Sequence, residues 1–354
     1  MLVAQGSTPA APIQAPVRAP VYGVLPTHFL AGNPESAQYP MELLRTGLEA
    51  RGARFVPPAL LEDVLRANRI RQTDSISAKA ARTIGEETEI RFLVASTLLS
   101  FASAPAPQLA IALHVVDVET GRRVLSSLVS LRGADFKGLL GLGEIVDEDV
   151  LALEVAARIL EEFDSEGRPA PFEPEDLEDF LPADSLARFN HREFAPLELE
   201  RVAVLPFINR TNRRNASRLF AEVLGHQWFR TAGIDVVEGS ELRAALVRQR
   251  VRSLDLLDEE LMRRVGEDLG VRYFLLGSVD RFETDSFRHG AFAPEVQASA
   301  RLLDVSRSRI VAAGSVHRRG DDYHLVLGLG VVKDLTSLAD RVGRELVALM
   351  GVKE

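Results

Sequence analysis

The hydrophobic pattern of the chain switches between two periods, and the two periods occur in the same order in both halves. Residues 109–115 alternate, with Leu109, Ile111, Leu113 and Val115 on one side and Ala110, Ala112 and His114 on the other. Such alternation predicts a β-strand. Residues 216–228 instead repeat every three to four positions, through Ala216, Leu219, Phe220, Val223, Leu224 and Trp228. That spacing predicts an amphipathic helix with one apolar face.

Each half is predicted to follow the order β-α-β-α-α-β-β-β-α. The first strand is expected at 21–26 in one half and at 202–207 in the other, and the helix that follows ends at Gly52 or Gly233. Glycine readily adopts the left-handed conformation of a helix C-terminal cap. Residues 119–121, Glu-Thr-Gly, provide the turn between two of the later strands. The order predicts an α/β fold in which a mixed sheet is flanked by helices.

Sequence matches in constant order relate the two halves. The segment Phe92–Ser96 is aligned with Phe274–Ser278 at an offset of 182 residues. The longest match joins Arg132–Gly143 with Arg319–Gly330, where seven of twelve positions are identical at an offset of 187; unrelated sequence would give about one. The larger offset places five extra residues in the second half before Asp304. The chain is therefore predicted to be a tandem duplication of one domain.

Four segments follow from this pattern. Residues 1–20 are rich in Ala, Pro, Gln and Ser, lack the basic and apolar regions of a signal peptide, and are expected to be a flexible tether. Residues 21–163 and 201–354 are the two repeated domains. Residues 164–200 are the linker between them. We expect that an export signal precedes the tether in the precursor.

The linker is acidic but also carries apolar side chains. It contains Phe172, Phe180, Leu181 and Phe189, more large apolar residues than a solvated linker usually has. One interpretation is that these side chains pack on the adjoining domains, and the other is that they dock a partner protein. They are candidate interaction residues on the second interpretation.

Net charge argues against one class of partner. Residues 161–200 hold 13 acidic and 3 basic residues, which leaves 39 basic and 38 acidic residues for the rest of the chain. Neither domain therefore has the basic surface that a nucleic-acid-binding protein needs, and no nucleic acid is expected as a partner. With no cysteine in 354 residues, disulfides and thiol chemistry are excluded.

Motifs for catalysis or cofactor binding do not occur in the sequence. The chain lacks a Gly-x4-Gly-Lys-Ser/Thr phosphate loop, a Gly-x-Ser-x-Gly nucleophile turn and the His-Glu-x2-His spacing of a zinc site. We therefore expect no enzyme, no catalytic residues, no cofactor and no metal. The repeated Arg-Gly-x-Asp-Phe/Tyr segment remains, with Arg319, Asp322 and Tyr323 as its residues in the second half. Either it completes the fold of each half, which is favoured, or it forms an interaction surface.

Several short motifs in the second half resemble one family. Val202-Ala-Val-Leu-Pro-Phe207, Leu276-Gly-Ser-Val279 and Arg301-Leu-Leu-Asp-Val305 are similar to the curli-secretion (CsgG-like), TolB N-terminal-like and flagellar outer-membrane-ring (FlgO-like) proteins. The resemblance covers about residues 202–350, and the first half shares it through its similarity to the second. It implies an anticodon-binding-like α/β domain that is used for protein–protein contact in the envelope of Gram-negative bacteria.

The resemblance leaves three functions open. The leading expectation is a periplasmic, outer-membrane-associated scaffold or assembly protein that binds other envelope proteins, self-associates into a ring, and attaches through a lipid anchor that this chain lacks. The second is a channel-forming subunit in which the Gly-Leu-Gly segments refold as membrane strands. Residues 281–295 are short for a spanning hairpin, however. The third is an intracellular regulatory accessory.

Overall fold

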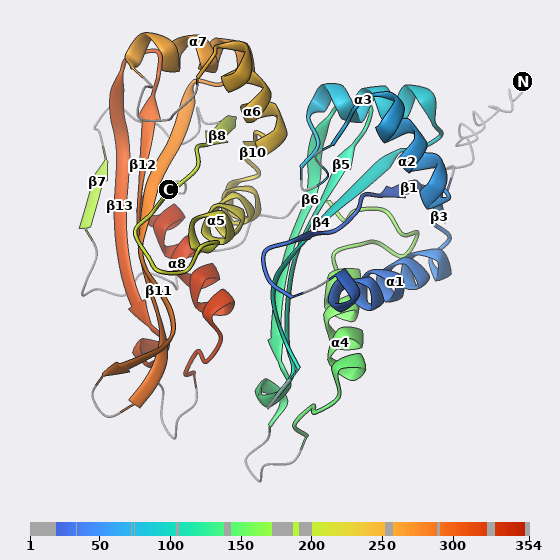
Figure 1. Cartoon of the computed structure of the whole chain (residues 1–354), viewed down its shortest axis with the longest axis horizontal. Coiled ribbons are helices and arrows are strands. Elements are labelled where there is room, and N and C mark those ends of the chain that lie inside the picture. Colours follow the sequence, from blue (N-terminus) through green and yellow to red (C-terminus); the bar gives the residue numbers. More distant parts are fainter. Residues whose placement is uncertain are drawn as a thin grey trace, which may run out of the picture.

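The computed structural model describes residues 19–32, 34–71, 73, 75–103, 106–137, 143–171, 187–190, 200–251, 258–288, 291–323 and 330–350. These residues form two α/β halves, each with one mixed sheet and four helices. Figure 1 shows the halves side by side, with helix α5 of the second half lying between the two sheets. The predicted fold class is confirmed.

The first half, residues 19–171, contains one six-stranded sheet in the order β3-β1-β4-β5-β6, with β2 paired to β4. The strands β1, β3 and β4 run parallel, and β4, β5 and β6 run antiparallel. Its elements are β1 (Val21–Val24), β2 (His28–Phe29), α1 (Pro34–Ala50), β3 (Arg54–Phe55), α2 (Pro58–Ala67), α3 (Ala78–Glu87), β4 (Phe92–Ala102), β5 (Gln108–Asp117), β6 (Arg122–Arg132), a 3-10 helix (Gly133–Phe136) and α4 (Glu148–Leu160).

The second half repeats this order in a seven-stranded sheet, β10-β8-β11-β12-β13-β7, with β9 paired to β11. The extra strand β7 comes from the segment before the half and covers the edge of β13. Its elements are β7 (Ala187–Asn190), β8 (Arg201–Val204), β9 (Ile208–Asn209), α5 (Ala216–Ala232), β10 (Asp235–Val236), α6 (Gly239–Arg248), α7 (Glu259–Leu269), β11 (Tyr273–Arg288), β12 (Ala291–Asp304), β13 (Arg309–Arg319), a 3-10 helix (Gly320–Tyr323) and α8 (Leu335–Leu349).

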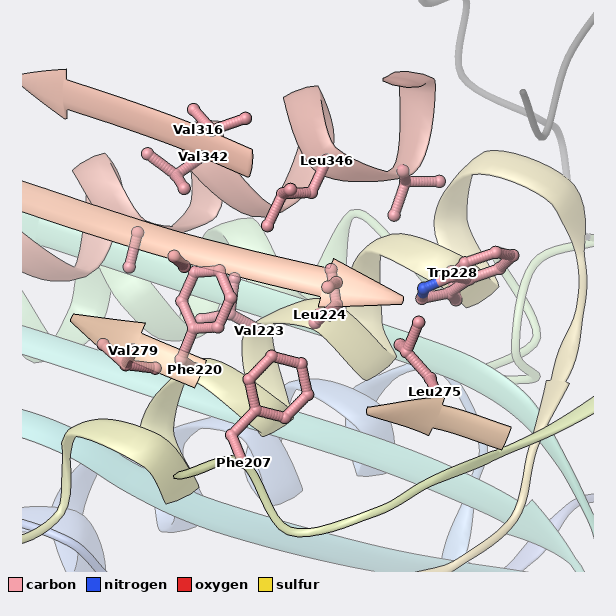
Figure 2. Close-up of a cluster of buried hydrophobic side chains, with 14 of the residues drawn as sticks. Phe207, Phe220, Val223, Leu224, Trp228, Leu275, Val279, Val316, Val342 and Leu346 are labelled. Carbon is pink, nitrogen blue, oxygen red and sulfur yellow. The ribbon is translucent and has the colours of Figure 1, made fainter. Parts of the chain in front are cut away.

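Each sheet packs against two separate helix pairs. Helices α1 and α4 contact each other and cover one face of the first sheet, where Leu44, Leu48 and Val155 join one apolar cluster. Helices α2 and α3 pack with β1 and the start of β4 in another cluster. In the second half α5 and α8 replace α1 and α4, and α6 and α7 replace α2 and α3. Figure 2 shows Phe220, Leu224 and Trp228 of α5 among side chains of β11 and α8.

The strand register corrects one part of the sequence alignment. Phe92 pairs with Asp117 in the first half and Tyr273 pairs with Asp304 in the second, so β4 and β11 correspond at an offset of 181. The aligned offset of 182 is wrong in this strand, because a slip of one residue would turn every side chain to the other face. A bulge after Leu98 and one after Val279 fall at the same place with the offset of 181. The insertion therefore comprises six residues.

Caps and turns follow the predicted chemistry at most positions. Gly52 and Gly233 follow α1 and α5 with φ of +92° and +62°. A residue in this left-handed backbone region commonly ends an α-helix. The turn between β5 and β6 has Gly121 at φ +70°, whereas the matching turn between β12 and β13 has Ser308 at φ +49°. A residue with a Cβ is strained in this region. The second half therefore holds an unfavourable turn that the first half avoids.

The beginning of the linker packs on the first half. The Tyr22 hydroxyl donates to the carbonyl oxygen of Gly167 at 2.7 Å, and Phe163 forms a β-bridge with Pro169. The Arg51 guanidinium donates to the carbonyl oxygens of Leu160 and Phe163. Residues 164–170 are therefore held against the sheet rather than extended into solvent.

Candidate protein-binding interface

The outer face of the first sheet is built to receive a helix. Because side chains alternate along β5, Leu109, Ile111 and Leu113 point to α1 and α4, while Ala110 and Ala112 point the other way. Ala110 and Ala112 belong to the apolar cluster of the second half, together with its helix α5. Alanine side chains leave room for a helix backbone to come close. The two halves thus share one core, and Figure 1 shows α5 against this face.

A polar network crosses the contact at its centre. His114 on β5 lies 3.1 Å from the Ser126 hydroxyl, and Ser126 lies 3.0 Å from Nδ1 of His226 on α5. Nε2 of His114 lies 3.2 Å from a carboxylate oxygen of Glu222, also on α5. A carboxylate only accepts hydrogen bonds, so Nε2–H of His114 is the donor to Glu222. The network satisfies two buried rings that would otherwise lose hydrogen bonds on leaving water.

Charge in this network depends on its environment. Burial lowers the pKa of His226 well below the usual value, and the nearby guanidinium of Arg230 adds to the effect, so this ring is neutral at pH 7. Burial alone would raise the pKa of Glu222. The hydrogen bond from His114 and the positive charge of Arg123 outweigh it, so the pKa of Glu222 lies below its usual value. Glu222 is therefore the negative charge of the network.

A buried ion pair closes one end of the interface. Arg123 on β6 donates to Glu238, the residue before α6, with Nη2 to Oε1 at 2.8 Å and Nε to Oε1 at 3.2 Å. Their side chains are only 5% and 9% exposed. A pair of charges withdrawn from water this far is costly unless both partners are present. The pair therefore makes the contact specific for the one position in which the charges meet.

A helix cap closes the other end. Asp334 caps α8 by accepting from the backbone N–H of Ser337, and the same carboxylate accepts from the Ser130 hydroxyl at 2.6 Å and from the Gln108 amide. The Arg132 guanidinium donates to the carbonyl oxygen of Lys333 at 2.8 Å. The start of α8 is thus fastened to the far ends of β5 and β6.

The matching face of the second sheet is partly exposed to solvent. Residues 109–117 of β5 are buried on both faces, whereas in β12 Gln297, Ser299 and Arg301 are partly or fully exposed between buried neighbours. A cavity of about 370 Å³ opens on this face. Its lining includes Ile208, Met262, Leu276, Ser299, Arg301 and Ile310. The second half thus carries the same kind of face with a polar centre and an apolar rim.

Large apolar side chains are exposed on the helix layer of the first half. Val146, Val150 and Leu153 at α4 are 74%, 46% and 52% exposed, and Tyr39 on α1 is 43% exposed. The same two helices carry exposed acids, Glu42 on α1 and Glu148 and Asp149 at the start of α4. Apolar groups at this density on one helix pair are typical of an interaction surface.

The repeated Arg-Gly-x-Asp segment has a structural explanation in both halves. The backbone N–H of Arg319 donates to Asp322, and that of Arg132 donates to Asp135 in the same way. A Cβ on Gly320 would lie 1.9 Å from the carbonyl oxygen of Val332, so only glycine fits there. The Tyr323 hydroxyl donates to Glu345 at 2.7 Å. Arg319 is 7% exposed in its side chain and donates to Ser286 and Asp321.

The candidate residues of the linker are only partly described. Phe172, Phe180 and Leu181 lie outside the described residues, and Phe189 belongs to strand β7, where its backbone pairs with Ala313. Docking of a partner on this strip stays a prediction. Sequence reasoning did not identify His114, Arg123, Glu222 or Glu238 as interface residues. The sequence feature that could have indicated this interface is the pattern of β5, whose residues are apolar or small on both faces of the strand.

Neither a metal site nor a membrane helix is found in the part of the chain that the structure describes. No group of three or more His, Asp or Glu side chains there is arranged to hold a metal ion. No helix among those residues has the length and hydrophobicity needed to span a bilayer.

Comparison with known proteins gives structural matches alone. The sequence matches no protein-family model and no curated protein. Among solved structures, the PelC dodecamer from Paraburkholderia phytofirmans has 16% identity and a TM-score of 0.32, covering 48% of this chain and 99% of that one. Lipoprotein GNA1162 from Neisseria meningitidis has 14% identity and a TM-score of 0.28 over 34% of this chain and 84% of that one. The LpoB C-terminal domain from Salmonella enterica has 18% identity and a TM-score of 0.27, over 34% and 82%.

Proposed function

We propose that the chain is a non-enzymatic scaffold of the bacterial envelope that works by binding proteins. The observation that supports this most is the interface inside the chain. There, the sheet face of one α/β half binds the helix layer of another α/β half through a shared apolar core, a buried ion pair and a polar network. On this proposal, each half binds protein through its sheet face and through its helix layer.

Two further surfaces of the same kind extend this argument. The face of the second sheet around Ser299 and Arg301 and the helix layer with Tyr39 and Val150 are the counterparts of the two surfaces already in contact. A monomer with no partner would leave these apolar groups in water, at a cost of about 25 cal/mol per Å². Placement in the envelope rests on the resemblance of residues 202–207, 276–279 and 301–305 to envelope proteins.

The test has two parts, for place and for binding. The untagged native protein is followed by protease accessibility in spheroplasts of its own cells, where we expect digestion before lysis. A photo-crosslinking amino acid is then placed at Val150 or Ile208, with the exposed Arg243 of α6 as the control position. Defined protein crosslinks are expected at the first two positions alone. A protected cytoplasmic protein refutes the location, and no crosslink at either surface refutes the binding role.

An aromatic pair supports a second candidate, the channel-forming subunit. The rings of Phe287 and Phe292 lie with their centroids 4.7 Å apart in a tilted arrangement at the end of the β11–β12 hairpin, and they are 60% and 70% exposed. Exposed apolar rings gain free energy when they leave water, and a lipid phase is one environment that would take them. Addition of the protein to liposomes separates the candidates, since a channel gives ion conductance that a Phe287→Ser, Phe292→Ser variant lacks. A protein that leaves the liposomes impermeable contradicts it.

A further inference from the structure

The second sheet and the first helix layer each present an exposed surface. The open sheet face consists of the outward residues of the second sheet, represented by Ile208, Arg281, Arg301, Ile310 and His317. The open helix layer is the exposed side of α1 and α4 with the start of α2, represented by Glu42, Pro57, Asp147, Asp149 and Val150. Inside the chain, the sheet face of the first half is covered by the helix layer of the second.

We propose that a second copy of this chain places its open helix layer on the open sheet face, repeating the internal interface between molecules. The proposal rests on the proposed protein-binding function and names the partner for these two surfaces. It is supported by the strand registers, which place the counterparts of several internal contacts on the open surfaces.

The central contact becomes an ion pair. Strands β1 and β8 correspond at an offset of 180, because Tyr22 pairs with Phe92 as Val202 pairs with Tyr273. Carried into the following helices, this offset makes Glu42 the counterpart of Glu222. The β5–β6 and β12–β13 registers correspond at 187, which makes Arg301 the counterpart of His114. His114 and Glu222 are in contact inside the chain. Between copies, Arg301 and Glu42 would meet, and both are exposed here.

The buried ion pair becomes an apolar contact. Arg123 corresponds to Ile310, because Val116 pairs with Arg123 as Leu303 pairs with Ile310. Glu238 precedes α6 as Pro57 precedes α2. Ile310 is 39% exposed and Pro57 is exposed. Both charges of the internal pair are thus replaced together by apolar groups, so neither copy would bury an unpaired charge.

The helix-cap contact has counterparts of mixed charge. Asp147 caps α4 as Asp334 caps α8, and Ser130, which donates to Asp334, corresponds to His317. Thr336 lies 3.5 Å from Ser100, and the counterparts of these two are Asp149 and Arg281. Asp147 and Asp149 would therefore meet His317 and Arg281, and these two side chains already contact Glu295, the counterpart of Gln108. The opposite charges of Arg301 and Glu42 therefore supply the complementary charge that gives the proposed contact its register.

Such a contact is heterologous, because it joins different surfaces of the two copies. Each added copy presents a new open face, so assembly continues until a ring closes or a filament forms. The internal interface would then alternate along the assembly with an intermolecular interface of the same geometry but different side chains.

The test is a charge exchange followed by sedimentation velocity from about 1 to 100 µM. The wild-type protein is expected to form concentration-dependent oligomers. Arg301→Glu and Glu42→Arg are each expected to sediment as monomers, because like charges meet at the centre of the contact. A mixture of the two variants restores opposite charges at every contact and is expected to regain at least tenfold tighter association than either alone. Arg243→Glu carries the same charge change on α6 and is expected to assemble normally.

The outcomes separate this inference from the proposed function. Restoration in the mixture excludes misfolding as the cause of the monomers, and circular dichroism of each variant checks folding directly. A wild-type monomer at all concentrations, single variants that still assemble, or a mixture of folded variants that stays monomeric overturns the inference. Crosslinks to other proteins at Ile208 or Val150 in a monomeric protein would leave the proposed function standing.

Discussion

Removal of one charge from the buried pair between the halves tests how much the internal contact contributes to stability. In Glu238→Gln the Arg123 guanidinium keeps its charge but loses its carboxylate partner, although it is only 5% exposed. Breaking a buried pair costs about 3–5 kcal/mol. Glu222 lies close enough to interact with the Arg123 charge and offsets part of this cost, so we expect a value near the lower end, about 3 kcal/mol.

The assay is urea unfolding followed by tryptophan fluorescence. Trp228 is fully buried in the shared core and is the only tryptophan, so its signal reports on that core. Asp63→Asn is the matched control, since Asp63 and Arg66 are 71% and 75% exposed and such a pair contributes less than about 1 kcal/mol. An equal decrease in the free energy of unfolding in the two variants would refute the reasoning. The Arg123–Glu238 pair would then contribute no more to stability than an exposed pair.

Three further predictions concern pH and backbone geometry. Because the pKa of His226 in the folded protein lies below its usual 6.5, the unfolded chain binds the proton first. The free energy of unfolding should therefore fall below about pH 6.5, by at most about 1.4 kcal/mol per pH unit, and urea titrations of His226→Gln should lack this part of the slope. Gly133→Ala places a Cβ 1.7 Å from the Ile145 carbonyl oxygen and should cost more than about 3 kcal/mol, against about 1 kcal/mol for Gly52→Ala, whose Cβ meets nothing within 4 Å. Ser308→Gly relieves a positive φ and should raise the urea midpoint by the equivalent of about 0.5–1 kcal/mol; a lowered midpoint would contradict the strain.

Local patterns were sufficient for the fold of each half. Alternation in 109–115 placed Leu109 and Ala110 on opposite faces, and Gly52 and Gly233 end their helices as predicted. These features depend on neighbours within a few residues, which is the range that periodicity and capping report. The offset of β11 was wrong by one because the match rested on similar residue types, and type alone does not say which face a strand residue occupies.

The candidate interface could not be predicted from local patterns, because its residues are far apart in the sequence. His114 and Glu222 are 108 residues apart, and Arg123 and Glu238 are 115 apart, so no local pattern links them. The Arg-Gly-x-Asp segment is repeated in both halves, and its Asp accepts from the backbone N–H of its Arg in each of them. The interface residues of the first sheet differ from their counterparts in the second sheet. The face of the first sheet is covered by α5, whereas the same face of the second sheet is exposed.

The central claim is that the open helix layer fits the open sheet face as the internal surfaces fit each other. A chain with no cysteine of its own allows a direct measurement. Ile310 and Pro57 are the counterparts of Arg123 and Glu238, which are in contact inside the chain. On mild oxidation, the protein with both Ile310→Cys and Pro57→Cys should therefore form disulfide-linked dimers and longer oligomers. Neither single variant should form such a ladder. Oxidation that leaves the double variant as an uncrosslinked monomer, in a sample that assembles by sedimentation, would contradict the claim.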